Sequence, residues 1–284
     1  MVVHIRPLST VFCESFIDGG IFLKYLRYAV GPVLILAIWW WLTTYTTVPA
    51  ILLPSPQSVL AAFARLIESG ELLGHIAASG FRALSGFALA TAVGLSLGLW
   101  LSRSKIAFES TDLLINALRV TPPLALIPLL ILWFGIEEAP KIAVVFLSGF
   151  FPIYLNTLSA FKSVDPKLLE VAASLRMTDK EVFRLVLWPA ALPGILTGLR
   201  IGFGYCWRAL VGAELIAAST GLGFMISESG EYLKTDCVFV GIITIAVLGI
   251  LMDNLIWFVI SRTKAVSRVA RPQGAPAARI HPQQ

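Results

Sequence analysis

Long apolar stretches separated by short polar segments dominate the pattern of this 284-residue chain. A helix that crosses a lipid bilayer needs about 20 mostly apolar residues. Stretches of about that length are Tyr28–Tyr45, His75–Leu101, Leu113–Phe134, Lys141–Phe161, Gly194–Ala218 and Val238–Ser261. We therefore predict an all-α membrane protein with six transmembrane helices.

The third stretch is interrupted by Pro122, Pro123 and Pro128. A proline lacks the backbone donor of a helix and its ring clashes with the preceding turn, so it kinks or breaks the helix. Membrane helices tolerate this where neighbours or water satisfy the freed carbonyl groups. We expect the third helix to kink or break at these prolines, and its ends stay open.

Composition supports a bilayer environment, because 57% of the residues are hydrophobic and only 14% are charged. Soluble domains carry about 25% charged residues. The cysteines (Cys13, Cys206, Cys237) and histidines (His4, His75, His281) are scattered, so we expect no metal site. The chain has neither the glycine-rich P-loop motif of nucleotide-binding proteins nor a catalytic cluster, and we predict that it is not an enzyme.

Most of the 22 lysines and arginines fall in segments on one side of the predicted membrane. Such residues concentrate in cytoplasmic loops, which predicts that both termini are cytoplasmic. The set comprises Arg6, Lys24, Arg27, Arg103, Lys105, Arg119, Lys162, Lys167, Arg176, Lys180, Arg184, Arg262, Lys264, Arg268, Arg271 and Arg279, against Arg65, Lys141 and Lys234 on the other side. This bias explains the basic composition, so nucleic acid is not an expected partner.

We divide the chain into three parts on these grounds. Residues 1–74 hold the N-terminal segment, the first helix and an outer loop with a short surface helix at Gln57–Ile67. Residues 75–262 form the transmembrane domain. Residues 263–284, rich in Pro, Ala and Gln, are predicted to be disordered.

The connection Ser163–Pro193 predicts two short helices before the fifth transmembrane helix. Asp165 followed by Pro166 is typical of a helix N-terminus, and Thr178 with Glu181 forms a capping-box pattern. Pro189 and Pro193 are expected to end the second helix. An amphipathic hairpin of this kind either docks into a groove of a partner or lies on the lipid headgroups, and the pattern leaves both open.

The residues of this connection carry a resemblance. Glu170–Leu175, followed by Leu187–Pro193, resembles the EAA loop of ABC-importer permeases. The resemblance extends from about Leu53 to Arg262 and includes the motifs Leu53–Pro56, Pro122–Leu129, Leu132–Gly135, Ser163–Pro166 and Ile195–Arg200. Together these motifs resemble the sulfonate/taurine/nitrate-type branch of the family.

The resemblance implies the permease subunit of an importer in the bacterial inner membrane, with the fold of methionine-importer permeases and cytoplasmic coupling helices. It implies a homodimer, ABC ATPase subunits that use ATP and Mg, a periplasmic solute-binding protein, and no cofactor on this chain. The small solute is expected to be an anion of the sulfonate, taurine or nitrate kind. The implied ATPase-docking residues are Glu170, Ala172, Ala173, Leu175, Arg176, Met177, Pro189 and Pro193.

Two positions depart from the family's pattern. Val171 stands at the first alanine position, and Arg176 stands where the family usually has glycine. Glycine permits a backbone turn that costs other residues on the order of 1 kcal/mol. We therefore expect Arg176 to adopt either a strained turn or a shifted one.

Charged residues inside the predicted helices are expected to be functional or paired. Arg82 and Arg208 lie at similar depths in the outer half and could attract an anionic solute, or could instead pair with a carbonyl or carboxylate. Glu214 is a poor helical partner for Arg208, since the two are six residues apart. Arg200 and Asp253, both in the inner half, predict a structural ion pair between the fifth and sixth helices.

Two other functions were weighed. An ion-coupled secondary transporter would need carboxylates near the bilayer midplane, and the candidates Asp253 and Glu214 are not central. A membrane enzyme acting on lipid would need a catalytic cluster. Finally, Gly86, Ala90, Gly94 and Gly98 recur every four residues, which favours close helix packing either within the subunit or across a dimer.

Overall fold

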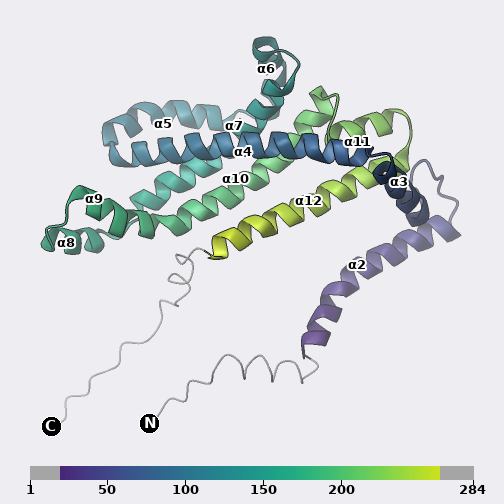
Figure 1. Ribbon diagram of the computed structural model, residues 1–284, viewed down its shortest axis with the longest axis horizontal. Helices are drawn as coiled ribbons and strands as arrows, with labels where there is room; N and C mark the ends of the chain where they lie inside the picture. The colour runs from purple at the N-terminus through teal and green to yellow at the C-terminus, as the bar shows by residue number, and fades with distance from the viewer. Residues whose placement is uncertain (1–19, 263–284) are drawn as a thin grey trace, which may run out of the picture.

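The structure, a computed structural model, describes residues 20–262, and side chains from 30 to 258. The described chain is helical, without strands, as predicted (Figure 1). Its elements are α2 (Gly20–Tyr45), α3 (Pro56–Glu68), α4 (Glu71–Arg103), α5 (Lys105–Val120), the 3-10 helix η1 (Pro123–Leu126), α6 (Ile127–Phe134), α7 (Glu138–Lys162), α8 (Pro166–Ser174), α9 (Asp179–Val182), the π-helix η2 (Phe183–Leu187), α10 (Trp188–Ala217), α11 (Leu222–Glu231) and α12 (Thr235–Arg262). The tail predicted to be disordered lies outside the described residues.

Four stretches of this helical chain are long and apolar enough to cross a membrane: Glu71–Arg103, Glu138–Lys162, Asp179–Ala217 and Thr235–Phe258. A shorter apolar helix, Val30–Tyr45, belongs to α2. The six predicted stretches therefore each coincide with helix in the structure, although their ends differ from the prediction.

The third predicted helix is broken, as its prolines indicated. The segments Lys105–Val120 and Pro123–Phe134 are bent by 87° relative to each other. Thr121 precedes Pro122 and adopts an extended conformation with ψ 121°, because the proline ring disfavours helical geometry in the residue before it. The helix also begins at Lys105 rather than at Leu113, so α5 is longer than the apolar pattern suggested.

Helix α7 lies at the centre of the bundle, between α4 and α10 (Figure 1). Glycines line both contacts. A Cβ atom added to Gly86 of α4 would lie 2.5 Å from Cγ1 of Val145, and one added to Gly202 of α10 would lie 2.5 Å from Cγ1 of Ile153. Small residues allow such close approach of membrane helices. The predicted series of small residues on α4 therefore packs inside the subunit, against α7.

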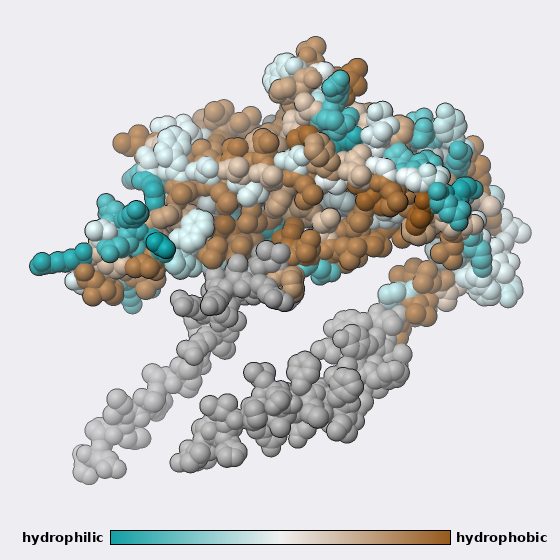
Figure 2. Space-filling model, viewed as in Figure 1, coloured by the Kyte–Doolittle hydropathy of each residue, from teal (hydrophilic) through white to brown (hydrophobic). Residues whose placement is uncertain are grey.

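Hydrophilic residues gather at the two ends of the long axis, and hydrophobic residues cover much of the middle (Figure 2). One end, here called the α8 end, holds α8 and α9 and the last residues of α4 and α7 (Figure 1). The opposite end, the α11 end, holds α3 and α11. The long axis is therefore the direction in which the helices cross a membrane.

Helix α3 confirms the short surface helix predicted at Gln57–Ile67. Ser55 caps it by accepting a hydrogen bond from the backbone N–H of Ser58. Its buried face packs with residues of α4, α11 and α12, including Leu72 and Met225. Helix α2 is attached nearby, where the Trp39 ring stacks on Phe239 at a centroid distance of 5.4 Å.

Candidate functional site

Helix α8 begins and ends with local signals that the sequence contains. The Asp165 carboxylate caps its first turn by accepting from the backbone N–H of Lys167 at 2.9 Å. At the other end, Met177 N–H donates to the carbonyl of Ala172 and Arg176 N–H to that of Ala173. This pair of bonds is the Schellman motif, which places one residue in the left-handed region and favours glycine there.

Arg176 occupies that left-handed position, with a φ of 51°. Of the two outcomes expected for this departure from the family's pattern, the strained turn is the one found. The cost is on the order of 1 kcal/mol, because a side chain at positive φ crowds the backbone.

The capping box at the start of α9 is present as predicted. Thr178 N–H donates to the Glu181 carboxylate at 2.9 Å, and Glu181 N–H donates to the Thr178 hydroxyl. The predicted end of this second helix, however, is wrong. The helix continues past Pro189 and Pro193 as one segment of 39 residues, Asp179–Ala217, so the fifth membrane helix begins far earlier than Gly194.

A π-helical turn at η2 explains how the helix passes Pro189. Trp188 N–H donates to the carbonyl of Phe183, five residues back instead of four. Such widened turns relieve the clash between a proline ring and the carbonyl of the preceding turn. The connection Ser163–Pro193 therefore consists of a separate short helix, α8, and of α9 and η2, which continue directly into α10.

Apolar side chains of α8 point away from the rest of the chain. Leu175 is 70% exposed and Val171 is 57% exposed. Of the residues expected to dock on an ATPase, Glu170, Ala173, Leu175, Arg176 and Pro189 are exposed, while Met177 and Pro193 are half-buried. Ala172 requires a correction, because it is 1% exposed and faces its own chain. It packs α8 in place and offers no surface to a partner.

Aromatic contacts connect this segment to the helix bundle. The Phe183 ring of η2 lies 6.2 Å from that of Phe161 on α7 and 6.1 Å from that of Trp188. The Arg103 guanidinium, at the end of α4, lies 4.4 Å from the centre of the Phe183 ring. Phe183 therefore connects the start of the α9–α10 helix to α4 and α7.

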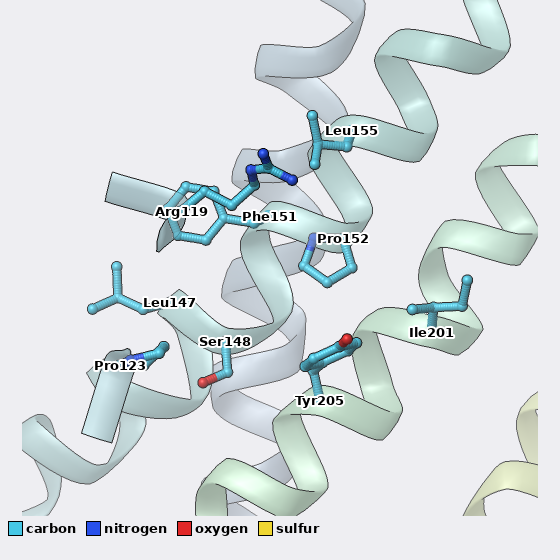
Figure 3. Close-up of a pocket in the computed structure, with 9 residues that line it drawn as sticks. All are labelled: Arg119, Pro123, Leu147, Ser148, Phe151, Pro152, Leu155, Ile201 and Tyr205. Atoms are coloured by element: carbon cyan, nitrogen blue, oxygen red, sulfur yellow. The ribbon is translucent and has the colours of Figure 1, made fainter. Parts of the chain in front are cut away.

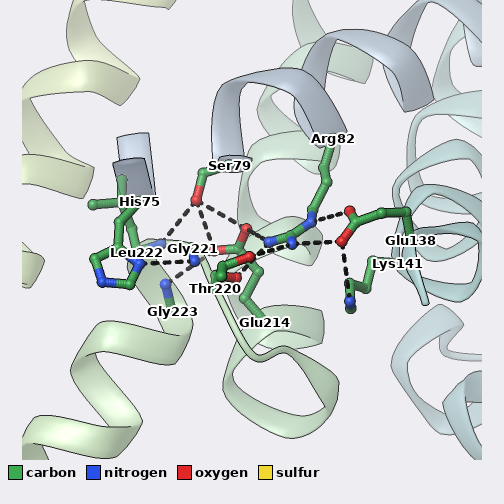
Figure 4. Close-up of polar contacts among 10 residues, drawn as sticks. All are labelled: His75, Ser79, Arg82, Glu138, Lys141, Glu214, Thr220, Gly221, Leu222 and Gly223. Atoms are coloured by element: carbon green, nitrogen blue, oxygen red, sulfur yellow. Dashed lines mark hydrogen bonds and ion pairs between the residues drawn. The ribbon is translucent and has the colours of Figure 1, made fainter. Parts of the chain in front are cut away.

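A buried polar network occupies the α11 end (Figure 4). At its centre is Arg82 of α4, which is 1% exposed. Its guanidinium donates to the Glu214 carboxylate of α10 at 2.7 Å and to the Glu138 carboxylate of α7 at 2.8 Å. It also donates to the carbonyl and hydroxyl oxygens of Thr220 at 2.6 and 2.9 Å.

Glu214 is satisfied from several sides. Besides the bond from Arg82, it accepts from the Ser79 hydroxyl at 2.8 Å and from Gly223 N–H at 3.0 Å. The Ser79 hydroxyl accepts in turn from Leu222 N–H at 2.9 Å. The network thus fastens the turn between α10 and α11 onto α4 and α7.

These contacts decide between the two roles considered for Arg82. Its donors are occupied and its side chain is buried, so it does not attract solute, and the structural alternative holds. Glu214 pairs with Arg82 rather than with Arg208. Sequence reasoning missed Ser79 and Glu138, because their partners lie on helices far away along the chain.

The Arg200 and Asp253 side chains meet between α10 and α12. Two hydrogen bonds of 3.0 and 2.6 Å join the guanidinium to the carboxylate, and each side chain is 44% exposed. With Glu214 held by Arg82 and Asp253 held by Arg200, the two carboxylates considered for ion coupling are both engaged.

A cavity of about 380 Å³ opens at mid-length of the bundle (Figure 3). Its apolar lining consists of Pro123, Leu147, Phe151, Pro152, Leu155 and Ile201, and its polar lining of Arg119, Ser148 and Tyr205. Arg208 is exposed close by, with its guanidinium carbon 5.7 Å from the centre of the Tyr205 ring. The second residue predicted for a solute path is therefore beside a cavity, unlike Arg82.

Arg119 also requires a correction. It was grouped with the cytoplasmic basic residues, but α5 carries it about 21 Å from Lys105 at 1.5 Å per residue. It lines the cavity together with the middle of α7 and α10. Its position inside the third apolar stretch, three residues before the first proline of the break, was the signal that could have revealed this.

Comparison with known proteins places these features in context. Residues 90–265 match the family described as binding-protein-dependent transport system inner membrane component. A protein named as an aliphatic sulfonates transport permease, SsuC of Bacillus subtilis, is 42% identical over 79% of this chain and 82% of its own length. The taurine permease TauC of Escherichia coli is 38% identical (77% and 82%), and the nitrate import permease NrtB of Synechocystis is 32% identical (89% and 91%).

A solved structure has a similar fold. An inward-facing structure of the MetNI methionine ABC transporter superimposes with a TM-score of 0.56, covering 70% of this chain and 95% of the matched chain at 19% identity. The predicted resemblance to methionine-importer permeases in fold, and to the sulfonate, taurine and nitrate permeases in sequence, is confirmed.

Proposed function

Since this chain belongs to the family of binding-protein-dependent transport system inner membrane components, the permeases of ABC importers, we propose that it carries a small anion of the sulfonate, taurine or nitrate kind into the cell. It does so as a homodimer in the bacterial inner membrane, with ATPase subunits bound at the α8 end and a solute-binding protein at the α11 end. Both chain termini face the cytoplasm. ATP and Mg are used by the ATPase, and this chain binds no cofactor.

The observation that carries the proposal is the exposed apolar surface of α8. Leu168, Leu169 and Val171 of this nine-residue helix and Leu175, the residue that caps its end, are between 39% and 70% exposed. A short helix with an unpartnered apolar face fits a hydrophobic groove of another protein. Basic residues surround it, among them Lys167, Lys180 and Arg184, as expected on a cytoplasmic face.

The docking surface is joined to the bundle by the continuous helix of α9, η2 and α10. This helix begins next to α8 and ends at the buried network around Glu214. ATP-driven closure of the ATPases would move α8, and Phe183 would pass that movement to Arg103 of α4 and Phe161 of α7. The helices that line the cavity would then open it to one side of the membrane or the other.

The solute assignment rests on the relatives and on charge. Permeases for aliphatic sulfonates, taurine and nitrate are between 32% and 42% identical to this chain. Arg208 is exposed beside the cavity, where it would favour an anion.

A charge placed on α8 tests the docking surface. We expect Leu175→Glu to abolish co-purification with the ATPase, because a carboxylate buried in an apolar interface costs several kcal/mol. The matched control is Leu60→Glu on α3, since Leu60 is 69% exposed at the opposite end of the bundle and Leu175 is 70% exposed. Both variants should reach the membrane in equal amounts, and equal ATPase recovery from both would contradict the docking surface.

A further inference from the structure

The mid-length cavity holds an arginine without a partner. Arg119 makes no hydrogen bond or ion pair with any residue from 30 to 258, whereas Arg82 and Arg200 are each paired with a carboxylate. An unpaired arginine at the centre of a bilayer is costly, and such residues face a water-filled cavity or a solute path. Arg119 does so, because it lines the cavity beside Phe151 (Figure 3).

A second free donor shares this cavity. Tyr205 of α10 is 50% exposed, and its hydroxyl makes no hydrogen bond within the described residues. Ser148 contributes no donor, since its hydroxyl already donates to the carbonyl of Val144 at 2.8 Å. The cavity therefore offers one guanidinium and one phenol, both able to donate to the oxygens of an anion.

The location of the cavity agrees with a solute path. Phe151 lies close to the midpoint of α7 (Glu138–Lys162), and Tyr205 lies in the middle part of α10. The break after α5 sets the position of Arg119, because η1 turns away there and contributes Pro123 to the same lining. The volume of about 380 Å³ falls within the ~300–1,000 Å³ typical of small-molecule sites.

We propose that Arg119 and Tyr205 form an anion-binding station at mid-membrane, and that this station takes the headgroup of a small alkanesulfonate. The inference rests on the proposed function and names the solute class at its transport path. A guanidinium fits two oxygens of a sulfonate at once, and the apolar lining suits a short alkyl tail.

The same lining discriminates between related solutes. No aspartate or glutamate lines the cavity. Asp112 on α5 lies outside the lining, and Asn116 donates to its carboxylate at 3.0 Å. The ammonium group of taurine would lose its hydration without gaining a partner, and nitrate has no tail to use the apolar wall. A simple alkanesulfonate should therefore bind more tightly than either.

Binding to the assembled permease–ATPase complex in nanodiscs tests this without the solute-binding protein. We expect labelled ethanesulfonate to bind, and taurine and nitrate to compete about tenfold less well, because an unpaired ammonium or a missing apolar contact costs more than about 1 kcal/mol. Arg119→Gln should lower ethanesulfonate affinity at least about tenfold, the value of a charge-assisted hydrogen bond, and Tyr205→Phe about three- to tenfold. Arg119→Lys should lie between wild type and Arg119→Gln.

Matched controls are Arg65→Gln and Tyr232→Phe, which remove the same groups outside the cavity at the α11 end. ATP hydrolysis by each complex reports assembly separately from binding. In vesicles with the solute-binding protein, Arg119→Gln should reduce the ethanesulfonate moved per ATP hydrolysed.

The possible failures are distinct. A wild-type complex that does not assemble with an ATPase would overturn the proposed function. Normal assembly and ATP hydrolysis with unchanged ethanesulfonate affinity in Arg119→Gln would overturn the anion-binding station alone. Equal competition by taurine would overturn the assignment to simple alkanesulfonates.

Discussion

Substituting alanine for Gly86 should weaken the contact between α4 and α7 and lower the stability of the whole bundle. The added Cβ atom would lie 2.5 Å from Cγ1 and 2.6 Å from Cβ of Val145, and 3.1 Å from the carbonyl oxygen of Ile142. Val145 is fully buried and β-branched, so its side chain has little freedom to rotate away. The two helices must therefore separate.

The size of the effect follows from that separation. Carbon atoms in contact prefer about 3.5–4.0 Å, so the helices would open by roughly 1 Å at this point. A gap of that size removes about a quarter to a half of the dispersion energy of each neighbouring contact. Overpacking of this kind typically costs about 1–3 kcal/mol.

Gly80 of the same helix supplies the matched control, since a Cβ atom there would meet nothing within 4 Å. Replacing glycine by alanine inside a helix is by itself favourable by about 0.5–1 kcal/mol, and comparing the two alanine variants cancels this gain. Gly86→Ala should therefore be less stable than Gly80→Ala by about 1–3 kcal/mol.

Thermal melting of the detergent-solubilised chain, followed by size-exclusion chromatography, measures the difference. At about 2–4 °C per kcal/mol for a protein of this size, the two midpoints should differ by about 2–12 °C. Gly94→Ala should fall between them, because its Cβ would lie 3.0 Å from Cγ2 of Ile153. Equal midpoints for the Gly86 and Gly80 variants would refute the close packing of α4 on α7.

Two further predictions concern Glu214 and Arg176. Glu214→Gln should destabilise the chain by about 1–3 kcal/mol, because it removes a buried carboxylate that accepts from Arg82, Ser79 and Gly223, while Glu138 still balances the Arg82 charge. Arg82→Met should cost more, about 3–5 kcal/mol, because it leaves the buried Glu214 carboxylate without a cation. Melting midpoints of the two variants check this, and an Arg82→Met variant as stable as Glu214→Gln would argue against the pair. Arg176→Gly should raise the midpoint by about 2–4 °C, since glycine removes about 1 kcal/mol of strain at positive φ, and should keep the ATPase bound. Loss of the ATPase at normal expression would mean that the Arg176 side chain itself contributes to docking.

Local signals in the sequence were sufficient for much of the fold. The caps at Asp165 and Thr178, the break at Pro122 and the surface helix α3 all depend on residues a few positions apart. The strained turn at Arg176 was also foreseeable, because a Schellman motif needs one residue at positive φ wherever it forms.

The prolines show where prediction from neighbouring residues alone was wrong. Pro122 breaks its helix as predicted, but Pro189 and Pro193 do not end theirs, and at Pro189 the preceding π-turn of η2 accommodates the ring. Phe183 in that turn is held by Phe161 and Arg103, which belong to other helices. A proline therefore ends a helix or is absorbed by it depending on neighbours that the local sequence does not contain.

By itself the sequence determined the positions of the apolar stretches, the capped helix α8 and the family, because length, periodicity and motif order are properties of the chain. Only the tertiary structure decided which charges are satisfied. Arg82 and Glu214 are 132 positions apart, and their contact removes Arg82 from the solute path. Arg119 stays unpaired among residues 30–258 for the converse reason, since helix packing brings none of their carboxylates into contact with it and the low dielectric of a membrane makes that difference decisive.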